Sequence, residues 1–110
     1  MFLQDPRHEL PNHFLGFSNP TRLRILERLG QVGEQNVSDL AEFMRMSQPR
    51  ISWHVRMLRV GGVIRVRRDG RQVWCSLDLD NIRRSRERLD EMLGIRQNAP
   101  KSKVREEVGA

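Results

Sequence analysis

The chain has 110 residues, which is enough for one domain with a modest core. Its formal net charge of +6 favours a polyanionic partner, with nucleic acid ahead of a membrane surface. One cysteine excludes an internal disulfide and fits a reducing compartment. The sequence shows no apolar run near the ~20 residues of a membrane span and no signal peptide, so we expect a soluble, cytoplasmic protein without a membrane partner.

The positive charge is concentrated in the middle of the chain. Residues 44–76 hold eight arginines and one acidic residue, whereas residues 1–43 hold four arginines and six acidic residues. The planar guanidinium of arginine suits phosphates and guanine edges better than the ammonium of lysine does. An arginine-rich genome would explain the choice of arginine over lysine, but it does not explain the clustering.

The start of the chain predicts an N-terminal arm, residues 1–13, ahead of the folded domain. Asp5-Pro6 carries the cap and the first-position proline of a helix, but Pro11 then interrupts the helical pattern. We therefore expect a broken or late-starting helix through residues 14–17.

The next three predicted helices include a helix-turn-helix. Asn19-Pro20 repeats the cap-plus-proline signal, and an aliphatic stripe then predicts a helix that ends at Gly30. A short helix capped by Ser38 follows, and another helix starts at Ser47 after a very short turn. Two short helices joined so tightly must cross steeply, as they do in a helix-turn-helix.

The helix that starts at Ser47 has a core face and an exposed face. Ile51, Val55 and Leu58 recur at helical spacing and define the core face. We predict that the rest of this helix contacts DNA through the following side chains: Ser47, Gln48, Arg50, Ser52, Trp53, His54 and Arg56. Two alternatives remain open here, namely a partly buried, hydrogen-bonded His54 and a Trp53 that packs on the hairpin or on a partner subunit.

Beyond this helix the pattern alternates, which predicts a β-hairpin with its turn at Asp69-Gly70. The turn implies a register that pairs Arg67 with Gln72, Val66 with Val73, Arg65 with Trp74, and Ile64 with Cys75. Arg65 is then expected to lie on the Trp74 ring, and Cys75 to be a small core residue. Three arginines crowd the tip and would repel one another unless an anion lies between them: Arg67, Arg68 and Arg71.

An amphipathic helix capped by Asp78 or Asp80 should close the folded domain, which we expect to span residues 14–94. Its aliphatic stripe has little of its own domain left to cover, which favours a two-fold dimer formed by the first and last helices. Packing against the first helix of the same chain is the alternative. The predicted dimer residues are Phe14, Phe17, Leu79, Ile82, Leu89, Met92 and Leu93, and residues 95–110 should form a disordered polar tail.

Several segments between Phe14 and Leu93 resemble the ArsR family of bacterial winged-helix repressors. They are N-P-T-R-L-R-I-L from Asn19, S-Q-P-x-x-S-x-H-V from Ser47, the G-G-V-I that ends at Ile64, and R-x-G-R at the hairpin tip. The resemblance implies a mainly α winged helix-turn-helix with a small β-hairpin. It also implies a homodimer, held by its first and last helices, that binds an operator and represses transcription until a signal releases it.

The resemblance does not extend to the metal sites of the family. One family site needs a C-x-C pair on the helix before the recognition helix, where this chain has Asp39, Leu40 and Ala41. Another uses D-x-H and H-x-x-E on the last helix, where this chain offers Asp78, Asp80 and Glu91 and no histidine. Because zinc sites in proteins normally include His or Cys, we expect no metal and no cofactor, and we interpret the two aspartates as helix caps.

These observations predict a sequence-specific regulator that binds double-stranded DNA, and they argue against an enzyme. The sequence has no phosphate-cradling glycine loop, no evident carboxylate pair and no nucleophile beside a base. Phosphate contacts are assigned to the arginines of the hairpin tip, with help from Arg45 and Arg59, and base contacts to the helix from Ser47. A winged helix that binds RNA or another protein is the alternative, because a fold does not dictate its ligand.

Overall fold

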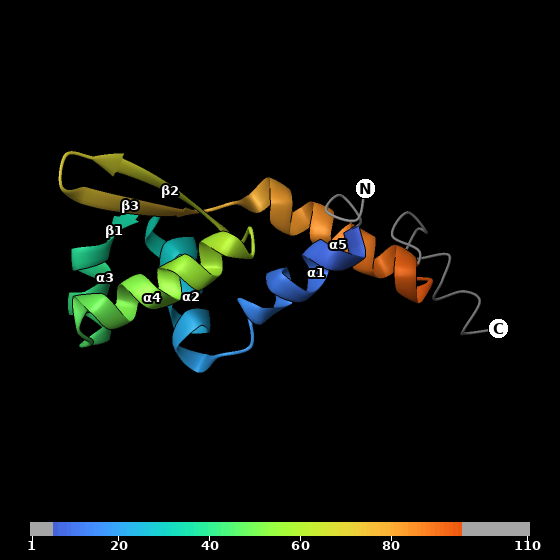
Figure 1. The fold of residues 1–110 in the computed structure, drawn as a ribbon, viewed down its shortest axis with the longest axis horizontal. Helices are drawn as coiled ribbons and strands as arrows, with labels where there is room; N and C mark the ends of the chain where they lie inside the picture. The colour runs from blue at the N-terminus through green and yellow to red at the C-terminus, as the bar shows by residue number, and fades with distance from the viewer. Residues whose placement is uncertain (1–5, 96–110) are drawn as a thin grey trace.

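The computed structural model describes residues 6–95, and it places side chains from Glu9 onward. Three antiparallel strands form a sheet in the order β1-β3-β2, with β2 and β3 as a hairpin (Figure 1). None of the described helices is long and apolar enough to cross a membrane. In chain order the elements are α1 (Pro6–Leu15), α2 (Pro20–Val32), β1 (Gln35–Asn36), α3 (Val37–Met44), α4 (Gln48–Val60), β2 (Ile64–Asp69), β3 (Gln72–Leu77) and α5 (Leu79–Leu93).

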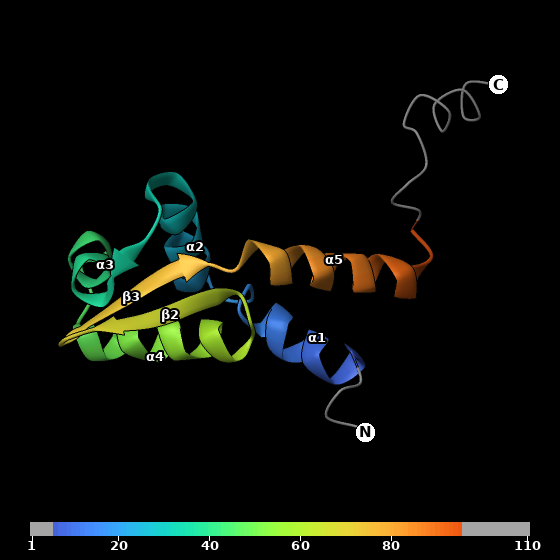
Figure 2. The ribbon, with the colours of Figure 1, turned by 90° about the horizontal axis from the view of Figure 1, so that it is seen from above.

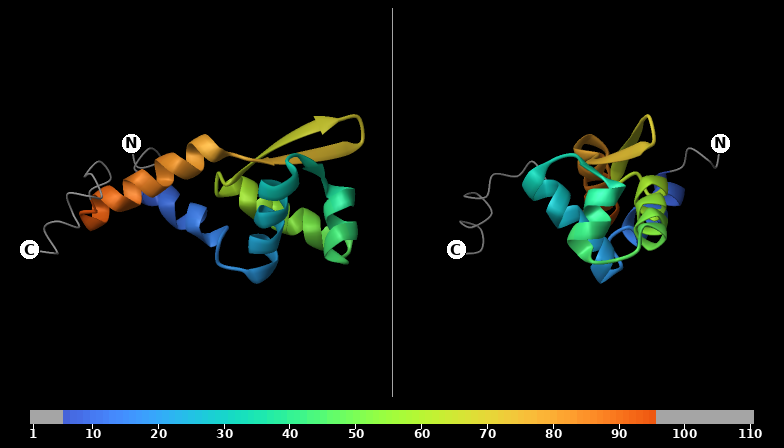
Figure 3. Two further views of the ribbon diagram at one scale, coloured as in Figure 1. Left: turned by 180° about the vertical axis from the view of Figure 1, so that it is seen from behind. Right: turned by 90° about the vertical axis from the view of Figure 1, so that its left-hand side faces the viewer.

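The described elements form a winged helix-turn-helix, as the sequence predicts. α3 and α4 are the two crossed helices, and the β2-β3 hairpin is the wing. The wing tip lies at the same end of the molecule as α3 and the start of α4, whereas α1 and α5 run side by side at the other end (Figures 1 and 2). Figure 3 shows the same separation from behind. One end of the chain therefore presents the candidate recognition helix, and the other presents two neighbouring helices.

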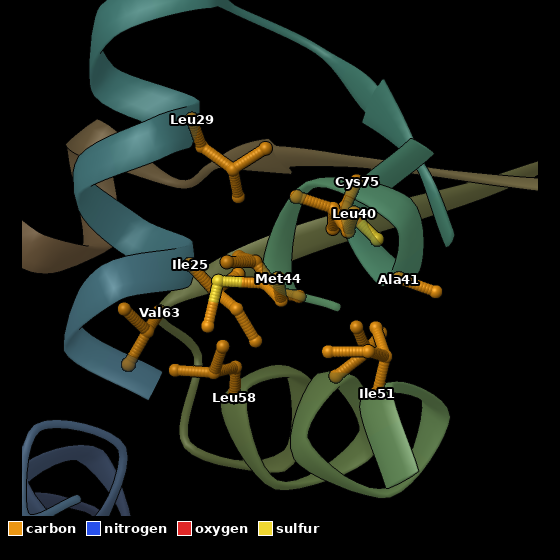
Figure 4. Close-up of a cluster of buried hydrophobic side chains, with 11 residues drawn as sticks. Ile25, Leu29, Leu40, Ala41, Met44, Ile51, Leu58, Val63 and Cys75 are labelled. Carbon is orange, nitrogen blue, oxygen red and sulfur yellow. The ribbon is translucent and has the colours of Figure 1, made fainter. Parts of the chain in front are cut away.

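The core lies between α2, α3, α4 and the inner face of the sheet. Ile25 from α2, Leu40 from α3 and Ile51 from α4 are completely buried and converge in the centre of Figure 4. Cys75 on β3 closes this cluster from the sheet side, as the sequence predicts for a small core residue. Burying side chains of this size contributes about 1.5–3 kcal/mol each, so this cluster fixes the orientation of α4.

The helix starts follow mainly from capping side chains. The side chains of Asn19, Ser47 and Asp78 accept hydrogen bonds from backbone N–H groups of the first turns of α2, α4 and α5, which confirms these predicted caps. The prediction for α3 was wrong, because Asn36 rather than Ser38 caps it, accepting from the Asp39 N–H at 2.7 Å. The predicted end of α2 at Gly30 was also wrong, because the helix continues to Val32. Its C-cap is Gly33, whose positive φ suits a glycine.

The first helix begins earlier than the sequence predicts. α1 starts at Pro6 and includes Pro11, so residues 6–13 belong to the folded unit and not to an arm. A proline removes one backbone hydrogen bond of a helix, and only about one helical turn of α1 precedes Pro11, so little of the helix is disturbed. Burial of Leu10 and His13 against the rest of the domain holds the helix together. Residues 1–5 and, apart from Ile95, the predicted tail lie outside the described residues.

The wing differs from the predicted register by two residues. Val66 pairs with Cys75 and Arg67 pairs with Trp74, because Gly70 and Arg71 form the turn. Gly70 has a φ of +62°, whereas Asp69 and Arg71 do not have positive φ values. That combination matches a type II′ turn, whereas a type I′ or type II′ turn centred on Asp69-Gly70 would have required a positive φ at Asp69. Because the shift is even, the side chains predicted on each face of the hairpin remain on that face.

The turn between α4 and β2 is held from both sides. The Gly61 carbonyl accepts a hydrogen bond from Nδ1 of His13 on α1 at 2.8 Å. The Gly62 carbonyl accepts one from Nδ2 of Asn81 on α5, also at 2.8 Å. A Cβ at Gly61 would lie 2.5 Å from the carbonyl oxygen of Asn12, so the backbone of α1 packs directly on this turn. The end of α4 is thereby fixed to both helices at the far end of the molecule.

Candidate nucleic-acid interface

The outward face of α4 carries most of the side chains that the sequence assigns to DNA. Ile51, Val55 and Leu58 are buried, which confirms the predicted core face. Trp53 lies on the other face with 53% of its surface exposed, so it is not enclosed within its own subunit. The remaining exposed residues among those predicted are Ser47, Gln48, Arg50, Ser52 and Arg56. The Ser47 side chain caps the helix, and Gln48 Nε2 donates to Ser38 Oγ at 3.2 Å.

His54 does not belong to this exposed face. Its side chain is only 7% exposed, and its Nδ1 lies 3.3 Å from a guanidinium nitrogen of Arg22 on α2. Burial lowers the pKa of His54 below its usual value of 6.5, and the charges of Arg22 and Arg50 lower it further. We therefore withdraw the prediction that His54 enters a DNA groove, and the alternative of a buried, hydrogen-bonded histidine is the one that the structure favours.

An open groove of about 310 Å³ separates the wing from the start of α3 and α4. Arg56 and Arg59 line it from α4, and Arg68 and Arg71 line it from the wing. Among the residues whose side chains the structure places, no carboxylate lies within ion-pair distance of any of these four arginines. Four guanidinium groups around one groove, without a counter-ion among the described side chains, favour an anionic ligand such as a phosphate backbone.

Arg67 is placed differently from the other arginines of the wing tip. Its guanidinium donates two hydrogen bonds to the Glu34 carboxylate, at 2.9 and 2.7 Å, and lies 5.4 Å from the centre of the Trp74 ring. The paired Arg67 guanidinium lowers the pKa of Glu34. The outer face of the wing also carries Arg65, which pairs with Asp78 and Asp80 and does not stack on Trp74 as predicted. The arginines of the outer face are therefore already neutralised within the chain.

The predicted dimer residues divide into two groups. Phe17 and Ile82 are partly buried and pack against the core of their own chain. Leu79, Met92 and Leu93 are about half exposed or more, so their predicted apolar surface is open. Phe14 and Leu89 have intermediate exposure. Two further exposed apolar residues, Leu15 and Ile95, were not predicted from the sequence. α1 and α5 are joined by an ion pair between Glu9 and Arg88 at 2.6 Å.

The acidic residues at the start of α5 serve the fold. Asp78 caps the helix and pairs with Arg65, while Asp80 pairs with Arg65 and Arg83. Within residues 9–95, no three or more His, Cys, Asp or Glu side chains lie close enough to hold a metal ion. Burial raises the pKa of the Cys75 thiol to about 11, so this sulfur is a poor metal ligand at neutral pH.

Arg22 is only 6% exposed, and its burial was not predicted from the sequence. It precedes Ile25 and Leu29 by three and seven residues and so falls on the buried stripe of α2. An arginine on a core stripe must find hydrogen-bond acceptors inside the protein. The helical spacing of Arg22 from Ile25 and Leu29 was therefore the sequence signal that could have predicted its burial.

The fold and the arginine-lined groove define a winged helix-turn-helix protein with a cationic surface beside its recognition helix. Residues 19–66 match the model of the arsR family of bacterial regulatory proteins. The transcriptional repressor SdpR of Bacillus subtilis is 37% identical over 67 residues, which cover 61% of this chain and 73% of the repressor. The chain belongs to the ArsR family, whose members are regulatory proteins and not enzymes.

Other relatives are matched over part of their length. An HTH-type transcriptional regulator of Methanocaldococcus jannaschii is 35% identical over 52% of this chain and 64% of its own length. An SmtB homologue of Synechocystis, named as a transcriptional repressor, is 34% identical over 66% of this chain and 54% of its own. The chain thus spans less than two thirds of these two relatives.

Solved structures show the same fold over most of the chain. A crystal structure of an ArsR family transcriptional regulator superposes with a TM-score of 0.70, covering 86% of this chain and 96% of that one at 26% identity. NolR of Sinorhizobium fredii superposes with a TM-score of 0.59, covering 82% and 90% of the two chains at 31% identity.

Proposed function

We propose that this protein is a homodimeric transcriptional repressor that binds a specific operator in double-stranded DNA. The observation that carries the proposal is the groove between α4 and the wing, where four arginines lie beside an exposed recognition helix and, within residues 9–95, have no carboxylate partner. The similarity to a named repressor, SdpR, supports repression over activation. A regulator of this kind acts in the cytoplasm, where bacterial DNA lies.

α4 enters the major groove with its exposed face toward the bases. Gln48 and Arg50 are at its start, where a recognition helix makes its base contacts, and they suit adenine and guanine respectively. Trp53 supplies an apolar surface for a thymine methyl group or a sugar. Arg56 lies one turn farther along, and it lines the arginine groove as well as the exposed helix face.

The arginine groove takes the phosphate backbone that flanks the major groove. Arg68 and Arg71 approach it from the wing, and Arg59 approaches it from α4. Phosphate contacts position a protein on DNA without reading sequence, so these residues supply affinity and register. Arg67 is not included, because Glu34 already neutralises it.

The dimer forms through α1 and α5, which lie at the end of the molecule away from the wing tip (Figure 2). The exposed apolar side chains of this end, including Leu79, Met92 and Leu93, would be covered by the same surface of a second copy. Two copies related by a two-fold axis would then present two α4 helices to half-sites one DNA turn apart, roughly 34–36 Å.

Selection of bound duplexes from a random DNA pool, at about 0.15 M salt, tests the proposal together with the mass of the protein in solution. We expect a palindromic consensus and a dimeric mass. A monomeric mass, or equal affinity for all duplex sequences, would contradict it. Preference for RNA, or for a protein in place of duplex DNA, would favour the alternative of a winged-helix interaction module.

A further inference from the structure

A buried arginine lies directly behind the DNA-facing surface of α4. Arg22 on α2 donates through Nη2 to the carbonyl of Leu15 at 2.9 Å and to Ser18 Oγ at 3.4 Å. Its Nη1 lies 3.3 Å from Nδ1 of His54 on α4. One guanidinium therefore connects the loop after α1 to the recognition helix, from a position that DNA does not reach.

The same two side chains also contact the exposed tryptophan. The Arg22 guanidinium carbon lies 5.9 Å from the centre of the Trp53 ring. The His54 ring meets the Trp53 ring edge-on, with the ring centres 5.1 Å apart. Because both groups are more than nine-tenths buried, they form a fixed support for an indole that is half exposed.

The contact between Arg22 and His54 requires a neutral histidine. A guanidinium has only donors, so Nδ1 of His54 must accept, and its proton must lie on Nε2. A protonated imidazole has donors on both nitrogens and a positive charge, so it would repel Arg22. The charged groups that act on His54 are Arg22 from α2 and Arg50 from α4 itself, and within residues 9–95 no carboxylate is paired with either.

We propose that Arg22 and neutral His54 form a positioning pair that orients Trp53 for base contact. Protonation of His54 breaks this pair and releases Trp53 from that orientation. Operator binding then weakens as the pH falls. This inference rests on the proposed function, because it concerns how the DNA-facing surface is held. The expected loss of operator affinity on acidification is opposite to the usual effect, since a new positive charge near DNA normally strengthens binding.

The first test compares Arg22→Met with Arg24→Met, an exposed arginine on the same helix. In Arg22→Met we expect operator affinity to fall by about tenfold, with affinity for unrelated duplexes and the salt slope unchanged, because Arg22 touches no phosphate. Fluorescence of Trp53, isolated by Trp74→Phe in both variants, should change only in Arg22→Met. An equal loss for all duplexes, or no difference between the two variants, would overturn the positioning role.

The second test uses the pH profile of His54 variants, which does not depend on whether Arg22→Met folds. Asparagine places an acceptor near the position of Nδ1 and cannot be protonated, whereas glutamine places it near Nε2. Between about pH 7.5 and about pH 5 we expect the wild type to lose about fivefold in operator affinity and His54→Asn to stay nearly constant. His54→Gln should be weak at both pH values.

The outcomes separate this inference from the proposed function. If the wild type shows no operator preference at about pH 7.5, the proposed function fails. If it shows a preference that stays constant or increases on acidification, and His54→Asn follows the same profile, the proposed function stands and the positioning pair is wrong.

Discussion

The two faces of the wing both carry arginines, but only the arginines of the outer face are paired with carboxylates of the described residues. On the outer face, Arg65 and Arg67 are paired with Asp78 and Glu34. On the side of the groove, Arg68 and Arg71 face Arg56 and Arg59 from α4. Adjacent residues of one strand, Arg67 and Arg68, thus differ completely in their availability to a ligand. Net charge counts both alike, but only unpaired charges can release counter-ions from DNA.

The largest effect should come from removing the arginines on the groove side of the wing. We expect Arg68→Ala combined with Arg71→Ala to lower affinity for all duplexes by roughly 10- to 100-fold, and to reduce the salt slope by about 2. Titrations of operator and unrelated DNA at several salt concentrations would measure this. An unchanged slope would mean that the groove does not hold phosphates.

An effect that depends on sequence, and that is smaller than the effect of the double variant on unrelated duplexes, is expected from Arg56 on α4. Arg56→Ala should cost roughly 1–3 kcal/mol on the operator and relax the sequence preference, because this residue lies on the exposed face of α4 as well as in the groove. Binding to a panel of operators with single base-pair changes would measure the preference. A uniform loss across the panel would make Arg56 a phosphate contact only.

Arg67→Ala should change DNA binding little, in contrast to the double variant of its neighbours. Its loss should instead lower the unfolding temperature slightly, as should Glu34→Gln. Because the folded-state pKa of Glu34 lies below 4.5, the contribution of its carboxylate to stability is complete above pH 4.5 and is lost as the pH falls through the folded pKa. Thermal unfolding at several pH values should show the wild type and Glu34→Gln converging in acid. A reduced salt slope for Arg67→Ala would place Arg67 in the DNA interface.

The smallest effect on DNA binding should come from oxidation or labelling of Cys75, which lies on the inner face of the wing. Its thiol is fully buried, and its pKa of about 11 keeps it protonated at neutral pH. We expect a thiol reagent to react at the rate of unfolding in the free protein, and oxidants to leave DNA binding unchanged. Rapid labelling under native conditions would show that the wing opens away from the core.

Local signals predicted much of this structure, and contacts between distant residues accounted for most of what was missed. The caps at Asn19, Ser47 and Asp78 and the core face of α4 depend on residues within one or two turns, so the sequence predicts them well. The hairpin register was predicted wrongly, because residue preferences placed the turn at Asp69-Gly70. The backbone angles of Gly70 place it at Gly70-Arg71 instead.

The candidate site shows the same division between local and distant contacts. The exposed positions of Gln48, Arg50 and Trp53 follow from helical geometry. The states of Arg67 and His54 follow from partners 33 and 32 residues away, Glu34 and Arg22. Helical spacing indicates that Arg22 is buried, but no pattern within one helix or strand identifies His54 as its partner or Glu34 as the partner of Arg67.

A substitution in the Gly61-Gly62 turn would act on both ends of the protein, because this turn joins the end of α4 to α1 and α5. A methyl group at Gly61 would collide with the Asn12 carbonyl, and one at Gly62 would collide with the Asn81 amide. Gly62 also has a positive φ that other residues rarely adopt. Alanine at Gly61 would therefore force α1 away from the end of α4, and alanine at Gly62 would displace the Asn81 side chain that links α5 to this turn. Neither change touches a base, yet the first would alter the distance between the two recognition helices of a dimer.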